Sequence, residues 1–169
     1  MSRAFVKEDG GSDALPERPV SPNRNLVTRR GLALIDAEIA TLRTALATAT
    51  RDGDRDGVAR VSRDLRYWAA RRASAEPVDP PANGERVSIG MAVTLESEDG
   101  ARRTYRIVGE DEADPKAGRI AWSAPVARAL LGRRVGEEVE IPAGTMEVVA
   151  IDAAPEPVPP PAGAAGDED

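Results

Sequence analysis

Three aspartates, Asp52, Asp54 and Asp56, alternate with other residues in the run Arg51-Asp52-Gly53-Asp54-Arg55-Asp56-Gly57. Carboxylates at this spacing can hold a divalent cation, and beside a metal they can orient an attacking water. The chain has no histidine and no cysteine. Any metal site would therefore use carboxylate oxygens, which favours Mg²⁺ or Ca²⁺ over zinc. The run also matches the start of an EF-hand loop, but the later glutamate that such a loop needs is absent.

The same aspartates also suit a purely structural role. Aspartate and glycine favour turns, and an aspartate that precedes a helix accepts hydrogen bonds from the first backbone N–H groups. Asp54 or Asp56 is therefore expected to cap a second helix, where the negative charge complements the helix dipole. The residue types alone leave the metal-binding and capping interpretations both open.

The segments on either side of this turn are predicted to be two helices folded back on each other. Apolar residues recur at intervals of three and four, which is typical of a narrow seam between antiparallel helices. The seam consists of Leu32, Ile35, Ile39, Leu42, Leu46, Val58, Val61, Leu65 and Trp68. Thr28 is expected to cap the first helix, which would be roughly 35 Å long at about 1.5 Å per residue. The second helix is expected to end near Glu76, before three prolines.

The surface of this rod is predicted to be basic. Its arginines outside the seam or at its edge include Arg43, Arg51, Arg60, Arg63, Arg66, Arg71 and Arg72. We expect Arg66, Arg71 and Arg72 to form a solvated helix face, with a role in lining a channel as the alternative. A basic shaft would thus carry an acidic tip.

From Val87 the apolar period changes from that of a helix to that of a strand. The expected strands lie near residues 91–96, 104–108, 119–122, 139–141 and 146–151. The turn Asp99-Gly100 joins the first two, and a short helix over 125–131 is expected to be capped by Ser123. We therefore predict an α+β fold, in which an antiparallel helical hairpin precedes an antiparallel sheet domain with one short helix.

Composition predicts how the chain is divided. Residues 1–26 and 154–169 are rich in proline, glycine and charge, so they are expected to be a disordered arm and a disordered acidic tail. Between them we place the hairpin at 27–76, a linker at 77–86 and the sheet domain at 87–153. The net charge of −6 argues against nonspecific binding to DNA. No apolar run reaches the roughly 20 residues of a membrane span, and together with the lack of cysteine this predicts a cytoplasmic protein.

A known family has the same spaced elements as the second half of the chain. These are Tyr105-Arg106-Ile107-Val108-Gly109, Asp111-Glu112-Ala113-Asp114, Ser123-Ala124-Pro125 and Ala127-Arg128-Ala129-Leu130-Leu131-Gly132. In that order they resemble the C-terminal domain of the bacterial Gre (GreA/GreB) transcript-cleavage factors, whose fold is similar to FKBP-type domains. A helical hairpin precedes this domain in the family, so the resemblance extends from Thr28 to about Ile151.

The resemblance implies a transcription elongation factor that binds bacterial RNA polymerase. The C-terminal domain would dock beside the secondary channel, with Ser123, Ala124, Pro125 and Arg128 as docking candidates, and the hairpin would enter the pore. The factor would have no catalytic residue or cofactor of its own. Its tip, here Asp52, Asp54 and Asp56, would help the polymerase cleave a backtracked RNA 3′ end, with Asp54 and Asp56 sharing a Mg²⁺ ion with the polymerase. We expect a monomer.

Two features of the hairpin depart from the family. It is about 20 residues shorter, so each arm loses roughly 15 Å, and its aspartates do not match the family's tip position by position. One expectation is therefore a factor that rescues backtracked complexes by cleavage, and the alternative is a regulator that occupies the channel without cleavage. A structural coiled-coil adaptor is a further alternative. A prolyl isomerase is disfavoured, because the sheet domain offers only Tyr105 and Trp122 for an aromatic pocket.

Overall fold

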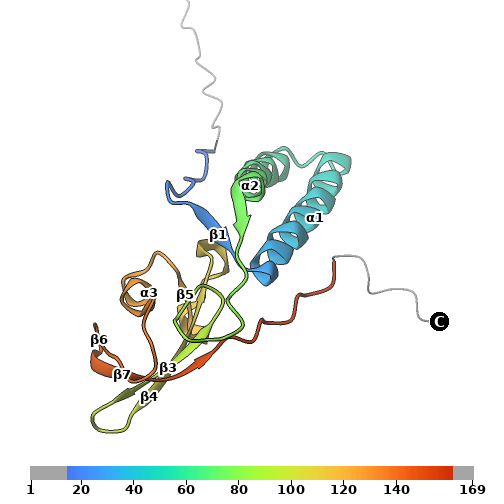
Figure 1. The fold of residues 1–169 in the computed structure, drawn as a ribbon. Helices are drawn as coiled ribbons and strands as arrows, with labels where there is room; N and C mark the ends of the chain where they lie inside the picture. Colours follow the sequence, from blue (N-terminus) through green and yellow to red (C-terminus); the bar gives the residue numbers. More distant parts are fainter. Residues whose placement is uncertain (1–14, 162–169) are drawn as a thin grey trace, which may run out of the picture.

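The computed structural model describes residues 15–161 of the chain, and it shows a helical hairpin standing out from a small sheet domain (Figure 1). The arms of the hairpin are α1 (Arg29–Arg51) and α2 (Arg55–Ser74). Thr28 caps α1 as predicted, because its hydroxyl accepts a hydrogen bond from the Gly31 N–H at 2.9 Å. The predicted hairpin and the α+β fold class are confirmed.

The seam of the hairpin is buried best at its root. Ile35 and Ile39 of α1 are buried together with Val27, and Leu65 and Trp68 of α2 pack against them. Farther out, Leu42, Leu46, Val58 and Val61 are only half-buried. Two helices alone can cover only one stripe of each other, whereas the root also packs against the strand that contains Val27.

The sheet domain holds five strands in the order β5-β4-β3-β7-β6. The strands are β3 (Ala92–Ser97), β4 (Arg102–Val108), β5 (Arg119–Ala121), β6 (Glu138–Ile141) and β7 (Gly144–Asp152). All neighbours are antiparallel except β4 and β5, which run parallel. The sheet is thus mixed instead of purely antiparallel. The connection between β4 and β5 crosses over through two 3₁₀ turns, η1 (Glu110–Glu112) and η2 (Pro115–Ala117). Because of this crossover, β5 runs in the same direction as β4.

One face of this sheet forms the main core. Alternate residues of the strands point into it, and α3 (Pro125–Leu130) covers it with Ala127 and Leu130. The core residues from the strands are Val93, Leu95, Ile107, Ile120, Val139, Ile141, Met146 and Val148. The short helix is confirmed, but its predicted cap is wrong. Ala124 occupies the N-cap position and makes no side-chain capping bond.

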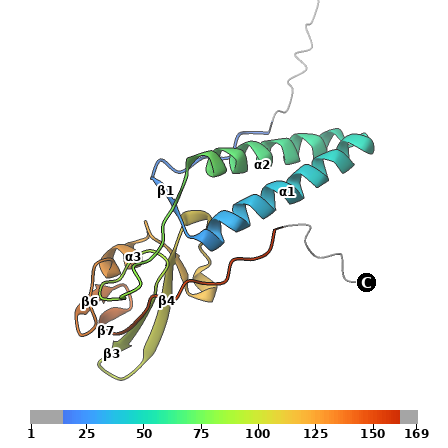
Figure 2. The same ribbon diagram turned by 45° about the vertical axis from the view of Figure 1, so that its right-hand side comes forward.

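The N-terminal arm is not disordered over its described part. β1 (Asn25–Val27) pairs in parallel with β2 (Ala75–Pro77), which follows α2 directly, so α2 ends at Ser74, close to the predicted end near Glu76. Before β1, the segment of residues 15–24 runs alongside α2 in space (Figure 2). Glu17 accepts hydrogen bonds from Arg66, and the Arg18 guanidinium lies 4.0 Å from the centre of the Tyr67 ring. Composition did not predict that this segment packs against α2, because its contacts are ionic and cation–π contacts and not apolar burial. The rest of the predicted arm, residues 1–14, lies outside the described residues.

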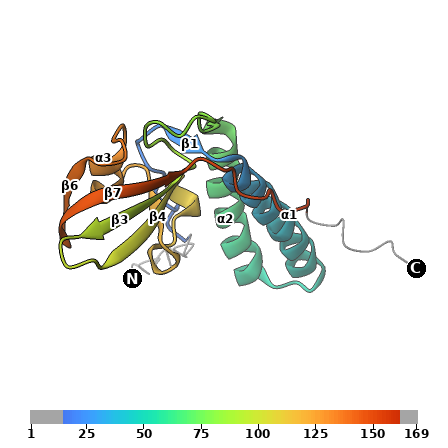
Figure 3. The same ribbon diagram turned by 60° about the horizontal axis from the view of Figure 1, so that its bottom comes forward.

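The predicted disordered tail likewise has a defined position over residues 154–161. It leaves the end of β7 and passes the N-terminal end of α1 (Figure 3). Glu156 forms ion pairs with Arg119 and Arg106 on the way. Residues 162–169 lie outside the described part of the chain. Within residues 15–161, no helix has the length and apolar character of a membrane span.

Candidate functional site

The far end of the hairpin is a tight turn that carries the three candidate aspartates. Gly53 adopts a left-handed backbone with φ of 69°, and a Cβ there would have no heavy atom within 4 Å. Glycine is favoured at this position by backbone conformation alone. A hydrogen bond closes the turn: the backbone N–H of Asp54 donates to the carbonyl of Ala49 at 2.9 Å.

Each tip aspartate has a different environment. The Asp54 carboxylate accepts a hydrogen bond from the Gly57 N–H at 2.9 Å, so it caps α2 as predicted. Asp52 accepts a hydrogen bond from the neighbouring Arg51 at 3.0 Å. Asp56 lies exposed in the first turn of α2.

These aspartates do not form a preassembled metal site. Among residues 15–161, no three carboxylates are gathered closely enough to hold an ion. One oxygen of the Asp54 carboxylate, Oδ1, is used by the helix cap. The described part of the chain therefore shows no complete metal site at the tip, and a Mg²⁺ ion shared by Asp54 and Asp56 with the polymerase stays a prediction.

The four docking candidates lie together at the start of α3. Ala124 and Pro125 begin this helix, and Pro125 and Arg128 are exposed. Ser123 is half-buried and donates its hydroxyl hydrogen to Glu110 at 2.8 Å. Ser123 therefore fixes the position of this loop, while Pro125 and Arg128 face outward and are accessible to a partner.

The root of the hairpin is joined to the sheet domain by a buried ion pair. Arg71 is 1% exposed and donates to Asp111 of η1 at 2.5 Å and to Asn25 at 2.8 Å. The expectation that Arg71 lies on a solvated or channel-lining face is therefore wrong. The Tyr67 hydroxyl donates to the other oxygen of Asp111 at 2.5 Å. Burial raises the pKa of Tyr67 to about 12, and the hydrogen bond to Asp111 acts in the same direction.

A second polar contact joins the start of α1 to η1. The Glu112 side chain is 3% exposed, and its carboxylate accepts hydrogen bonds from Thr28 at 2.6 Å and from Arg30 at 2.9 Å. A Cβ on Gly31 would lie 2.6 Å from the Glu112 carboxylate, so a larger residue there would displace this side chain from its contacts with Thr28 and Arg30. The Arg71 and Glu112 contacts together fix where the hairpin begins.

Residue types alone missed this junction. Arg71 looks like any other arginine of the basic shaft, and Asp111-Glu112 looks like part of an exposed acidic loop. Two signals were present, namely the i, i+4 spacing of Tyr67 and Arg71 on α2 and the position of Asp111-Glu112 within the family motif.

Comparison with known proteins shows which family has this sequence. Residues 81–153 match a family model described as the C-terminal part of transcription elongation factor GreA/GreB. Over 151 residues the chain is 34% identical to transcription elongation factor GreA of Desulfovibrio desulfuricans, an alignment that covers 79% of this chain and 92% of that protein. The chain belongs to the GreA/GreB family.

A second curated relative and a solved structure are also similar to the chain. The chain is 35% identical over 127 residues to GreA of Sphingopyxis alaskensis, covering 65% of this chain and 77% of that protein. Among solved structures, GreA factor homolog 1 (Gfh1) of Thermus thermophilus is 22% identical and covers 76% of this chain and 99% of its own, with a TM-score of 0.37. The loop of residues 123–128 lies inside the matched family region, whereas the tip aspartates lie outside it.

Proposed function

We propose that this GreA/GreB-family chain binds bacterial RNA polymerase and regulates transcript elongation. The observation that carries the proposal is the family match over the sheet domain, combined with a helical hairpin fixed to that domain by the Arg71–Asp111 pair. The sheet domain would dock at the secondary channel through the loop of residues 123–128, and the hairpin would enter the pore. The protein would be cytoplasmic, because bacterial RNA polymerase is, and it would act as a monomer.

The docking step has a direct test. Pro125 and Arg128 are exposed on one short helix, so a reversed charge there disturbs the contact without touching the core. Core polymerase should co-purify with the wild-type chain and less well with Arg128→Glu. Arg134→Glu, an equally exposed change outside the loop, is the matched control and should bind as the wild type does. No binding by the wild-type chain would overturn the proposal.

We further propose that the hairpin occupies the channel and does not itself promote efficient cleavage. The structure of the tip supports this choice, because Asp54 is used as a helix cap and the three carboxylates do not converge. The length of α1 also supports it. At 23 residues the helix extends about 35 Å, and the shortening relative to the family is several times a metal–carboxylate distance of roughly 2–2.6 Å. The chain would have no catalytic residue of its own, and the RNA 3′ end would be affected only through the polymerase.

Stalled, backtracked elongation complexes distinguish occupancy from cleavage. The variant of choice replaces Asp52, Asp54 and Asp56 with asparagine, because asparagine caps helices about as well as aspartate but is a poorer metal ligand. We expect neither the wild type nor the triple variant to shorten the RNA, and both to displace an authentic cleavage factor. Cleavage by the wild type that disappears in the triple variant would instead show that the tip carboxylates take part in the chemistry.

A further inference from the structure

Three arginines from three elements converge where the hairpin meets the sheet domain. Arg106 and Arg119 are paired neighbours on the parallel strands β4 and β5, and Arg30 lies in the first turn of α1. We call these three residues the arginine cluster. The side chains of Arg106 and Arg119 are only 18% and 15% exposed. Glu112 holds two of the three, because it accepts from Arg30 at 2.9 Å and from Arg119 at 2.8 Å.

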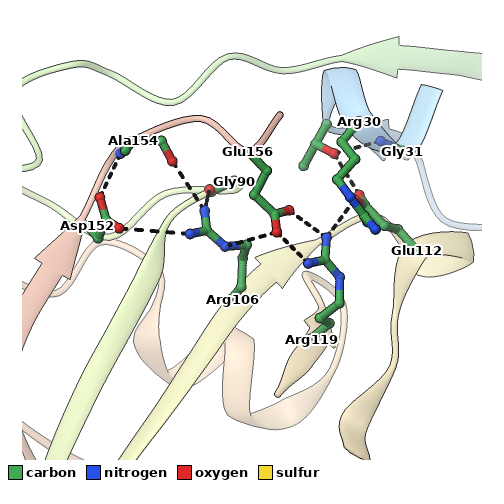
Figure 4. A network of polar contacts seen from close by, with 10 residues as sticks. Arg30, Gly31, Gly90, Arg106, Glu112, Arg119, Asp152, Ala154 and Glu156 are labelled. Atoms are coloured by element: carbon green, nitrogen blue, oxygen red, sulfur yellow. Dashed lines mark hydrogen bonds and ion pairs between the residues drawn. The ribbon is translucent and has the colours of Figure 1, made fainter. Parts of the chain in front are cut away.

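Arg119 and Arg106 also contact the C-terminal tail at Glu156, while Arg106 donates in addition to the carbonyl of Gly90 at 2.8 Å (Figure 4). Both guanidinium Nη atoms of Arg119 donate to the two carboxylate oxygens of Glu156 at 2.6 Å. Arg106 lies 3.6 Å from the same carboxylate and donates to the backbone carbonyl of Ala154 at 3.3 Å. This two-pronged pairing of arginine with carboxylate is the geometry that proteins use to recognise a carboxylate ligand.

An apolar cavity extends the contact beyond the carboxylate. The cavity has a volume of about 210 Å³, and Val78 and Pro80 line it from the segment after β2. Pro155 and Val158 line it from the tail. The hydrogen bond from Arg119 lowers the pKa of Glu156, so the carboxylate is held in its charged form. The surface thus recognises both a negative charge and the apolar residues beside it.

The tail segment, residues 154–158, is held against the fold only by its contacts with the neighbouring elements, as an extended peptide ligand would be. It follows the last strand, β7, and belongs to no helix or strand. Its prolines restrict the backbone, which lowers the entropy lost when an extended peptide is bound. Because it is tethered next to the site, its effective concentration there is on the order of millimolar.

We propose that the arginine cluster and the adjoining cavity form a binding site for an extended, acidic, proline-containing peptide. The chain's own residues 154–158 are its resident ligand, and a partner peptide of the same chemistry binds by displacing them. The site is built from residues other than the tip aspartates and the docking candidates, so the proposal does not rest on polymerase binding.

The test uses full-length chains and a fluorescent synthetic peptide of residues 153–161. Glu156→Gln removes the charge that competes from within the chain, so the peptide should bind this variant at least tenfold more tightly than it binds the wild type in fluorescence anisotropy. A peptide with glutamine in place of its glutamate should bind the same variant at least tenfold more weakly. The matched control is Glu137→Gln, which removes a half-buried carboxylate that pairs with Arg133 and lies outside the arginine cluster, and it should leave the wild-type affinity unchanged.

Every other outcome overturns the proposal. Equal affinity for wild type and Glu156→Gln would mean that the tail does not compete for the site, and equal affinity of the two peptides would mean that no carboxylate is recognised. A lower melting temperature of Glu156→Gln without peptide binding would show that the tail only braces the fold. Circular dichroism of each variant verifies the fold, and the comparison of the two peptides needs no second change in the protein.

Discussion

At the scale of single residues, the most consequential contact is the buried pair of Arg71 and Asp111. Arg71→Leu leaves the Asp111 carboxylate, only 9% exposed, without its charged partner. We expect the free energy of unfolding to fall by about 3–5 kcal/mol in urea denaturation. Arg72→Leu removes the neighbouring exposed pair with Asp36 and is the matched control, with an expected loss of roughly 0–1 kcal/mol. Similar losses for the two variants would contradict the assigned role of burial.

Tyr67 gives the junction a dependence on pH. Its pKa is raised from 10.0 to about 12 by burial and by the hydrogen bond to Asp111. The folded state therefore keeps this proton at a pH where the unfolded state has lost it. The resulting contribution to stability is present below pH 10 and is lost as the pH rises toward 12. Urea denaturation across this range should show a steeper loss of stability for the wild type than for Tyr67→Phe, and identical slopes would refute the assignment.

At the scale of elements, the hairpin depends on the cap that starts α2. Asp54→Ala removes the acceptor for the Gly57 N–H and should lower the free energy of unfolding by about 0.5–2 kcal/mol. Asp54→Asn keeps a capping oxygen and should stay close to the wild type. Thermal unfolding followed by circular dichroism at a helix-sensitive wavelength measures both. If the asparagine variant is as unstable as the alanine variant, the charge of Asp54 matters more than its cap.

At the scale of the whole molecule, two apolar cores are joined by polar contacts. One core lies in the sheet domain and the other at the root of the hairpin. The buried Arg71 and Glu112 contacts connect them, so we expect the parts to unfold in one cooperative transition.

A single-tryptophan variant tests this coupling. Trp68→Phe leaves Trp122 as a fluorescent reporter of the sheet domain, while circular dichroism reports mainly the helices. The two melting curves should coincide. Adding Asp111→Asn should weaken the junction and let the helical signal melt first. Separate transitions already present in Trp68→Phe alone would show that the hairpin is independent of the sheet domain.

The sequence by itself determined the local elements of this protein. The seam spacing predicted both helices, and alternation predicted the strands. Thr28 was predicted as the cap of α1, and Asp54 or Asp56 as the cap of α2. Each of these signals depends on neighbours within a few residues. The family motif around Tyr105 to Gly132 likewise identified the sheet domain.

Tertiary structure alone decided where charged residues that look alike in the sequence lie. Arg71 is buried while Arg72 is exposed, and the proline-rich ends lie against the fold over residues 15–24 and 154–158. Composition predicts whether a segment can bury apolar area, but these segments are held by ion pairs and a cation–π contact whose partners lie far away along the chain. The electrostatic energy of such a pair depends on distance and burial in space, and neither quantity is encoded by local residue type.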